Sequence, residues 1–414
     1  MLAKNILILS LVHVVRLVLP LLLIPILTRR IAADEFGIYM YAISFSAWLS
    51  IFIEYGFSIS STREIAGTNS REEISATIHG TQSAKFLLIM ATLPFLAFAI
   101  FFVPVFKEYS YWAITAWLLG VLTALSPIYY FQGREKLGVV GIVEASSGLM
   151  TFIAVFYLIH GSEDFYRLSL IILTAKVVGL VFLTRKMYLN AGISKFIFCN
   201  FHDGIKILKS GFNLFIFQGA VSFYTLFNVV FLGFFCSPVQ VGYYAVAERL
   251  MRAGLGFIGQ FSNAIFPRLN SMRLGQPEKM KKLRLHALFY FFLIGLLGMV
   301  LTWLLSPLVV KYMFGEKFND VTNIIQTLAL LVPAVAISSV LGFQYLLVDR
   351  HEKLFNMIIV GAALVNVSIA YMLIMKFEAQ GMAISWIVVE WIIMIALSIA
   401  VFSLRRTKAS IITD

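Results

Sequence analysis

The sequence predicts an all-α polytopic membrane protein. Of its 414 residues, 60% are hydrophobic and only 13% are charged, whereas soluble domains contain roughly 25% charged residues. The mean hydropathy is +0.89, and apolar segments of membrane-spanning length follow one another along the chain. These segments leave no stretch long enough for a soluble catalytic domain.

Each transmembrane helix needs about 20 mainly apolar residues. The twelve segments that meet this requirement are 6–29, 37–57, 84–106, 109–131, 138–160, 165–189, 210–235, 239–265, 285–314, 322–348, 353–375 and 379–404. The first segment has no small-residue cleavage site behind a short apolar core. We therefore expect it to be a retained helix rather than a signal peptide.

The basic residues predict the orientation in the membrane. If the N-terminus is cytoplasmic, 22 of the 33 Lys and Arg residues fall on the cytoplasmic side and 7 on the outer side. Cytoplasmic loops normally carry this excess, so we expect both termini in the cytoplasm. The cytoplasmic set includes Lys85 and Arg284, which we assign to loops and helix ends. The net charge of +12 then indicates topology and attraction to membrane lipids, not nucleic-acid binding.

The four remaining basic residues fall near the middle of predicted helices. They are Arg16, Lys176, Arg249 and Arg252. A charge at this depth is disfavoured by about 2.5–3.5 kcal/mol on insertion scales, so it needs a counter-ion, water or a partner. Pro20, one turn after Arg16, removes a backbone hydrogen bond and bends the helix. Four cations at a similar depth predict an anion-binding site.

Buried carboxylates leave other interpretations open. Glu248 lies four residues before Arg252, so the two side chains can form a salt bridge on one helix face, which leaves Arg249 as the free charge. Glu390 stands alone in the last predicted helix. It is either a partner for one of the bases or a proton or cation site.

The chain also contains an internal repeat. The segment around Gly37 matches the segment around Gly242 at a constant offset of 205 positions, and a second pair of segments begins at Glu135 and Glu352. Six predicted helices separate the copies, which predicts two six-helix lobes related by a pseudo-two-fold axis along the membrane normal. The lobes would be residues 1–190 and 210–414, joined by a cytoplasmic linker at 191–209. Alternating access by rocking of the lobes follows from this architecture.

Several sequence blocks resemble a known family. They are VRLVLP at 15–20, PILTR at 25–29, EFGIY at 35–39, EYGF at 54–57, STREIA at 61–66, SPIYYFQGRE at 126–135 and VGYYAVAERL at 241–250. These blocks are similar to those of bacterial O-antigen flippases, polysaccharide transporters of the multidrug/oligosaccharidyl-lipid/polysaccharide exporter superfamily. The blocks fall in both halves of the chain.

The resemblance implies a substrate and a location. It implies that the protein flips an undecaprenyl-diphosphate-linked oligosaccharide, an O-antigen or related surface glycan unit, from the inner to the outer leaflet of the bacterial inner membrane. Arg16, Arg249, Arg252 and Lys176 would bind the diphosphate, since guanidinium groups match phosphate bidentately. Arg63 is a candidate for substrate loading, and Glu54 and Glu390 for coupling to protons or sodium. Other proteins of surface-glycan assembly are candidate partners.

Two alternative functions remain open. A cation-coupled drug antiporter of the same superfamily would share the fold, but a site for cationic drugs calls for buried carboxylates, and the excess buried charge here is positive. A membrane enzyme acting on lipid-linked sugars would need a large outer loop or an acidic metal site. We find no such loop, metal-ligand spacing or cofactor motif, and therefore expect a transporter without cofactors.

Overall fold

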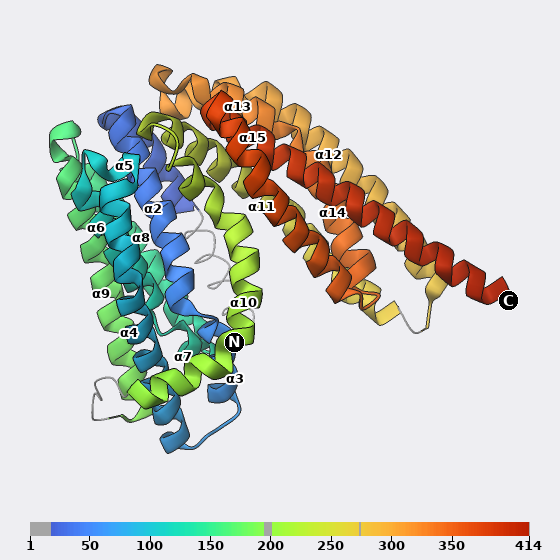
Figure 1. The fold of residues 1–414 in the computed structure, drawn as a ribbon, viewed down its shortest axis with the longest axis horizontal. Helices are drawn as coiled ribbons and strands as arrows, with labels where there is room; N and C mark the ends of the chain where they lie inside the picture. Colours follow the sequence, from blue (N-terminus) through green and yellow to red (C-terminus); the bar gives the residue numbers. More distant parts are fainter. Residues whose placement is uncertain (1–17, 194–200, 273–274, 414) are drawn as a thin grey trace. The chain divides into compact units, whose positions relative to one another are not determined.

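The computed structural model describes residues 18–193, 201–272 and 275–413. Within these ranges the regular structure is helical, and no strand is present (Figure 1). The chain divides into two compact units, Met1–Gly242 and Tyr243–Asp414. Each unit is a bundle of helices, and each is described here by itself.

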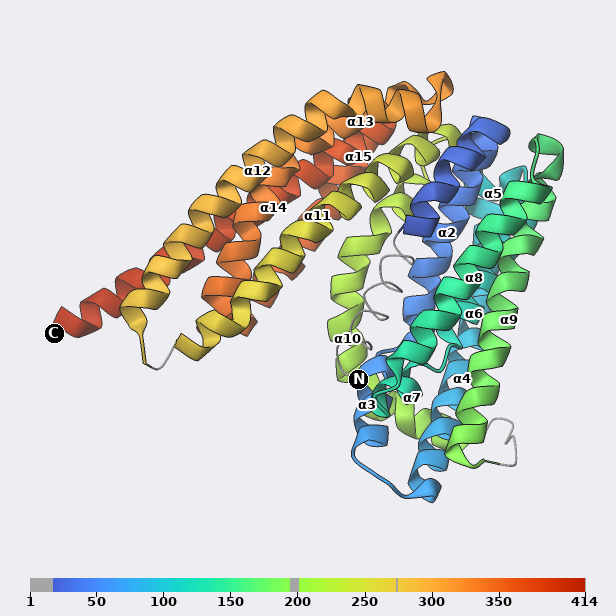
Figure 2. The ribbon, with the colours of Figure 1, turned by 180° about the vertical axis from the view of Figure 1, so that it is seen from behind.

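The first unit contains residues 18–30, which are helical, followed by nine further α-helices in the described part of the chain. These are α2 (Ala33–Glu54), α3 (Phe57–Ala66), α4 (Arg71–Phe102), α5 (Pro104–Lys107), α6 (Ser110–Ala124), α7 (Ile128–Gly133), α8 (Leu137–Leu158), α9 (Phe165–Ala191) and α10 (Phe201–Leu232). Helix α2 packs on α6, α8 on α9, and α10 on both α4 and α2, as Figures 1 and 2 show from opposite sides.

Two of the predicted helices are broken near one end. The segment predicted as 37–57 is α2 and then α3, because Tyr55 and Gly56 both adopt left-handed backbone angles, with φ of 51° and 84°. The segment predicted as 109–131 is α6 and then α7, which meet at Ser126 and Pro127. Proline has no N–H group and keeps the preceding residue out of the helical region, so α6 cannot continue through this point.

Helix α4 starts much earlier than expected. Its N-cap is Ser70, whose hydroxyl accepts a hydrogen bond from the Glu73 N–H group at 3.5 Å. Such a cap satisfies one of the free N–H groups of the first turn. As a result Lys85, which we assigned to the cytoplasmic end of a helix starting at residue 84, lies in the interior of α4 and is 1% exposed.

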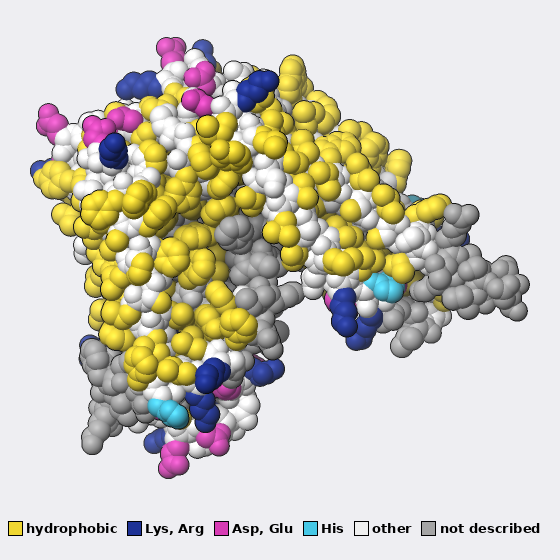
Figure 3. Space-filling model, in the orientation of Figure 1, with side chains coloured by type: hydrophobic (Ala, Val, Ile, Leu, Met, Phe, Trp, Pro, Cys, Tyr) yellow, Lys and Arg dark blue, Asp and Glu magenta, His cyan; other side chains and the backbone are white. Residues whose placement is uncertain are grey.

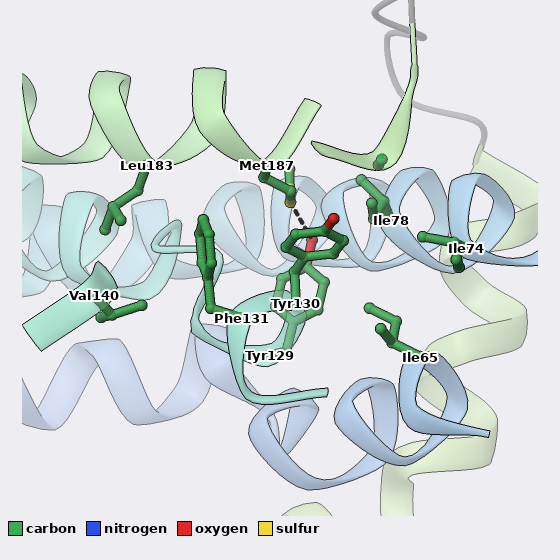
Figure 4. Close-up of a cluster of buried hydrophobic side chains, with 10 residues drawn as sticks. Ile65, Ile74, Ile78, Tyr129, Tyr130, Phe131, Val140, Leu183 and Met187 are labelled. Carbon is green, nitrogen blue, oxygen red and sulfur yellow. Dashed lines mark hydrogen bonds between the residues drawn. The ribbon is translucent and has the colours of Figure 1, made fainter. Parts of the chain in front are cut away.

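A hydrophobic cluster fixes the short helix α7 in place. Tyr129, Tyr130 and Phe131 pack among Ile65 of α3 and Leu183 of α9, with other buried side chains of α4, α8 and α9 around them (Figure 4). The cluster therefore ties the two broken segments α2–α3 and α6–α7 to the long helices of the first unit.

Gly37 and Gly242, which the internal repeat aligns, lie against each other in the first unit. A Cβ atom on Gly242 would be 2.9 Å from the Gly37 Cα atom, and one on Gly37 would be 1.8 Å from the Pro238 carbonyl oxygen. Both positions therefore require the absence of a side chain, which is a packing requirement and not a conformational one.

The second unit contains most of α11 (Pro238–Met272), then α12 (Pro277–Phe314), α13 (Asp320–Ala329), α14 (Leu331–Ser339) and α15 (Glu352–Thr413). Helix α14 continues into a π-helical segment, Val340–Leu347. Helix α15 is two helices joined at Glu378, whose φ of 49° and ψ of −128° are not helical. This break lies between the predicted segments 353–375 and 379–404.

Eight helical segments of the described residues are long and apolar enough to cross a membrane. Their side chains agree with this, because many large apolar residues are exposed, for example Phe101 at 76% and Phe257 at 69%. Figure 3 shows hydrophobic side chains over the long helices of the first unit, with charged side chains gathered near the helix ends. The chain is a multi-pass membrane protein.

Candidate functional site

The first unit contains a cavity of about 410 Å³ that is lined by both charged and hydroxyl side chains. Its walls come from Leu19 and Pro20, from the end of α6, and from α8 and α9. Lys176 of α9, one of the four predicted anion-binding residues, lines this cavity. Lys176 therefore lies at a cavity inside a helical unit, and its role in binding an anion stays a prediction.

The polar lining includes side chains that sequence analysis did not select. They are Glu144, Ser147 and Thr151 of α8, and Thr123 and Ser126 at the end of α6. On α8 the three polar residues are spaced by three and four positions, so they share one helix face. That spacing within an otherwise apolar segment is the sequence signal that could have identified them.

Close packing of α8 and α9 positions the polar groups of the cavity. Gly179 follows Lys176 by three residues, and a Cβ atom there would lie 2.7 Å from the Ser147 Oγ atom. The absence of a side chain at residue 179 lets the two helices approach, which brings Lys176 and the hydroxyl groups of α8 to the same cavity.

The second unit holds a connected group of charged and aromatic side chains. The Glu248 carboxylate accepts hydrogen bonds from Arg252 Nη2 at 2.6 Å and Nε at 3.1 Å, which confirms the pairing that their spacing predicted. The Arg252 guanidinium lies 4.8 Å from the centre of the Trp386 ring. Trp386 Nε1 in turn donates to Glu390 Oε1 at 3.2 Å.

These contacts change the interpretation of two predicted residues. The charge of Arg252 is offset by Glu248, whose side chain is 9% exposed, so Arg252 adds little net charge to an anion site. Glu390 is not isolated but bonded to Trp386, which lies against Arg252. Arg249, on the same helix and partly buried, has no ion pair within the described residues.

The candidate loading and coupling residues lie in the first unit. Glu54 is the last residue of α2, and its carboxylate lies 3.1 Å from Lys85 Nζ. Arg63 is exposed on α3. Glu54 therefore has a partner that sequence analysis did not identify, because Lys85 was counted as a base at the membrane surface. The capping residues Ser70 and Glu73 were the signal for the earlier start of α4.

The other predicted site residues are divided between the two units or lie outside the described residues. Arg16 lies outside the described residues, so its position relative to Lys176 stays a prediction. Lys176, Glu54 and Arg63 belong to the first unit, whereas Arg249, Arg252 and Glu390 belong to the second. Among the described residues, no group of three or more His, Cys, Asp or Glu side chains is placed to hold a metal ion.

Comparisons with known proteins place the sequence among membrane proteins of glycan biosynthesis. A family model described as polysaccharide biosynthesis protein matches residues 2–273. Two relatives are both named "Putative O-antigen transporter". One, from Escherichia coli K12, is 26% identical and covers 95% of this chain and 94% of its own. The other, from Shigella dysenteriae, is 28% identical, and the match covers 95% of this chain and 98% of the relative.

Two solved structures have a similar fold. The lipid II flippase MurJ, in an inward closed conformation, aligns with a TM-score of 0.72 at 16% identity, over 96% of this chain and 87% of its own. A eukaryotic MATE transporter aligns with a TM-score of 0.57 at 13% identity, over 97% of this chain and 96% of its own. At these identities the likeness shows the fold alone.

Proposed function

Because the chain belongs to the polysaccharide biosynthesis protein family, we propose that it is a flippase for lipid-linked oligosaccharides. It moves an undecaprenyl-diphosphate-linked glycan unit, an O-antigen or related surface glycan, from the inner to the outer leaflet of the bacterial inner membrane. The names of the two relatives support this substrate class. The protein is a transporter and not an enzyme.

The observation that carries the proposal is the cavity of the first unit. A lipid-linked sugar brings an anionic diphosphate and many hydroxyl groups to a depth where hydrocarbon cannot solvate them. The cavity offers the ammonium of Lys176 to an anion, and the hydroxyls of Thr123, Ser147 and Thr151 to a sugar. The described lining also contains the Glu144 carboxylate, so the cavity holds one base and one acid.

The arginines predicted at membrane depth are further candidates for binding the diphosphate. Arg249 keeps its full charge for the substrate, since Glu248 pairs with Arg252. Arg16 precedes Pro20 by four positions in the sequence, and Pro20 lines the same cavity as Lys176. On these grounds we propose Arg16 for the same anion site. Arg252 contributes through its position beside Trp386 and less through charge.

Other residues are proposed for loading the substrate and for coupling its transport to an ion. Arg63, exposed on α3, would first meet the diphosphate. Of the two candidate coupling residues, Glu390 is favoured because Glu54 is held by Lys85. The ion that moves with Glu390 would be a proton or sodium.

We propose twelve transmembrane helices in two lobes, residues 1–190 and 210–414, with a linker at 191–209. The contact between Gly37 and Gly242 supports the repeat, because residues equivalent under a two-fold rotation touch each other only at the axis. Alternating access then follows by rocking of the lobes, with both termini in the cytoplasm.

The test is leaflet transfer in proteoliposomes. An undecaprenyl-diphosphate oligosaccharide and a cationic dye are compared as substrates for the native protein, for Lys176→Met and for Lys281→Ala, a control at an exposed lysine. We expect transfer of the lipid-linked sugar by the native protein and the control, and loss of transfer in Lys176→Met. Dye transport without lipid transfer would overturn the proposal in favour of a drug antiporter.

A further inference from the structure

Lys85 is a buried lysine surrounded by oxygen atoms and aromatic rings. Its Nζ atom lies 2.6 Å from the Ala124 carbonyl oxygen, 3.1 Å from Glu54 Oε2 and 3.4 Å from the Ser126 carbonyl oxygen. The rings of Tyr129 and Phe57 lie on two further sides, with centres at 5.0 and 5.9 Å. The side chain of Lys85 is 1% exposed.

Each of these oxygens comes from a helix break. Glu54 is the last residue of α2, just before the left-handed Tyr55 and Gly56. Ala124 is the last residue of α6, just before the turn that contains Ser126. The last carbonyl groups of a helix have no partner within it and carry a partial negative charge. One ammonium group therefore neutralises both the Glu54 carboxylate, whose side chain is 27% exposed, and a helix end.

We propose that Lys85 is a tethered cation, whose ammonium group fills a site that would otherwise bind a monovalent cation. One carboxylate and two main-chain carbonyls are the kind of oxygen ligands that replace the water shell of such ions. Because the cation is covalently attached to α4, the two helix breaks are joined permanently, without a dissociable ion. Glu54 is then the counter-charge of Lys85 and not a coupling residue.

The site has a consequence for the proposed binding cavity. The turn held by Lys85 carries Ser126, whose main-chain oxygen accepts from Lys85 and which also lines the cavity with Lys176. Lys85 is therefore a positioning residue for the cavity wall. This consequence rests on the proposed function, whereas the tethered cation itself does not.

The second unit contains a buried base paired with an acid, although within the described residues no main-chain carbonyl groups surround it as they surround Lys85. Arg284 of α12 is 8% exposed in its side chain and binds Asp349 through two hydrogen bonds of 2.9 and 3.2 Å. Its guanidinium lies 4.7 Å from the centre of the Tyr345 ring. Here too a buried base, an acid and a tyrosine meet where a membrane helix ends.

The C-terminus of α7, the helix that follows the turn held by Lys85, and the end of the segment Val340–Leu347 share one backbone pattern. In each, three successive backbone N–H groups donate hydrogen bonds to the carbonyl oxygens four, three and five residues earlier. The N···O distances, in that order, are 3.1, 3.0 and 2.7 Å in the first unit and 3.0, 3.2 and 2.8 Å in the second unit. The middle residue has a positive φ, 54° at Glu135 and 65° at Arg350. The donors are Arg134, Glu135 and Lys136 in the first unit and Asp349, Arg350 and His351 in the second.

The experiment measures the thermal unfolding of purified Lys85→Ala in detergent, with choline, sodium or ethylammonium as the only added cation. We expect a lower midpoint than native in choline, and a rise with increasing sodium or ethylammonium, since a ligand that binds the folded state stabilises it. The native protein and the exposed-site control Lys281→Ala should not respond. Adding Glu54→Gln to Lys85→Ala should abolish the response.

A native-like midpoint of Lys85→Ala in choline, or a midpoint insensitive to the small cations, would overturn the tethered cation. If Lys85→Ala does not fold, Lys85→Met is compared with the double variant Lys85→Met/Glu54→Gln. The double variant should be the more stable, because Lys85→Met alone leaves the partly buried Glu54 carboxylate without its counter-charge. Equal stability would contradict the inference. The two proposals can fail separately. If small cations stabilise Lys85→Ala but the native protein transfers no lipid-linked sugar, the tethered cation is upheld and the proposed function is refuted.

Discussion

Arg249 and Arg252 are three residues apart on α11, yet their electrostatic surroundings differ. Glu248 and the Trp386 ring contact Arg252, and a paired charge with an aromatic neighbour is already stabilised in place. Arg249 has no ion pair within the described part of the chain, so an anionic substrate would meet its full charge. Sequence spacing predicted the pairing of Glu248 with Arg252, and the side-chain geometry confirms that pairing.

We therefore expect Arg249→Ala to lower the transfer of lipid-linked sugar about 10- to 100-fold, the factor for losing a charge-assisted hydrogen bond of roughly 1.5–3 kcal/mol. Arg249→Lys should recover only part of the activity, because an ammonium group cannot bind phosphate bidentately. Initial transfer rates in proteoliposomes measure both. Arg268→Ala, an exposed position on the same helix, is the matched control, and an equal loss there would argue against a specific role.

The salt bridge between Glu248 and Arg252 gives a second prediction. Glu248→Gln should lower the free energy of unfolding by about 1–3 kcal/mol, because it removes a charged hydrogen-bond partner from a partly buried arginine. The double variant Glu248→Gln/Arg252→Met should be less destabilised than the sum of the single changes. Chemical unfolding of the four proteins in detergent gives this double-mutant cycle. Strict additivity would mean that the two side chains do not interact.

At the scale of the element, close approach of helices depends on a few glycines. The N-terminal turns of α2 and α11 meet at Gly37, where a Cβ atom would lie 1.8 Å from the Pro238 oxygen. The obstacle is a backbone atom, so no side-chain rotation relieves the clash. The short helix α7 depends in a similar way on Gly133, where a Cβ atom would lie 2.9 Å from the Thr62 oxygen.

Gly37→Ala should therefore destabilise the protein by about 1–3 kcal/mol, the usual cost of overpacking a close contact. The matched control is Gly254→Ala on α11, where nothing lies within 4 Å of the added Cβ atom. That change should be neutral or stabilise by up to about 1 kcal/mol, because alanine favours the helix. Thermal unfolding of both variants checks the prediction, which fails if the two midpoints move alike.

At the scale of the whole molecule, the distribution of charge predicts the orientation in the membrane. Positions near 63–71 and 134–136 carry several bases, whereas the turn between α8 and α9 holds Glu163 and Asp164 with Arg167. Since cytoplasmic loops carry the excess of Lys and Arg, the first group should face the cytoplasm. The turn at Ser162 should face the opposite side.

Cysteine labelling tests this topology in a chain whose Cys199 and Cys236 are replaced by serine. Ser70→Cys should react with a membrane-impermeant maleimide only in inverted vesicles, and Ser162→Cys only in intact spheroplasts. Both positions are exposed, so a lack of reaction reports the side of the membrane and not burial. Labelling of both from the same side would contradict the predicted topology.

The sequence by itself determined the class of the protein, because hydropathy over about 20 residues is a local property. It also indicated Lys176 as a deep cation and the pairing of Glu248 with Arg252, since helical spacing is local too. Only the tertiary structure decided the partner of Glu54. Lys85 is 31 residues away along the chain, and the carbonyl oxygens that complete its surroundings carry no sequence signal. The grouping of Glu144, Ser126 and Lys176 around one cavity likewise required three helices to pack, which no local pattern encodes.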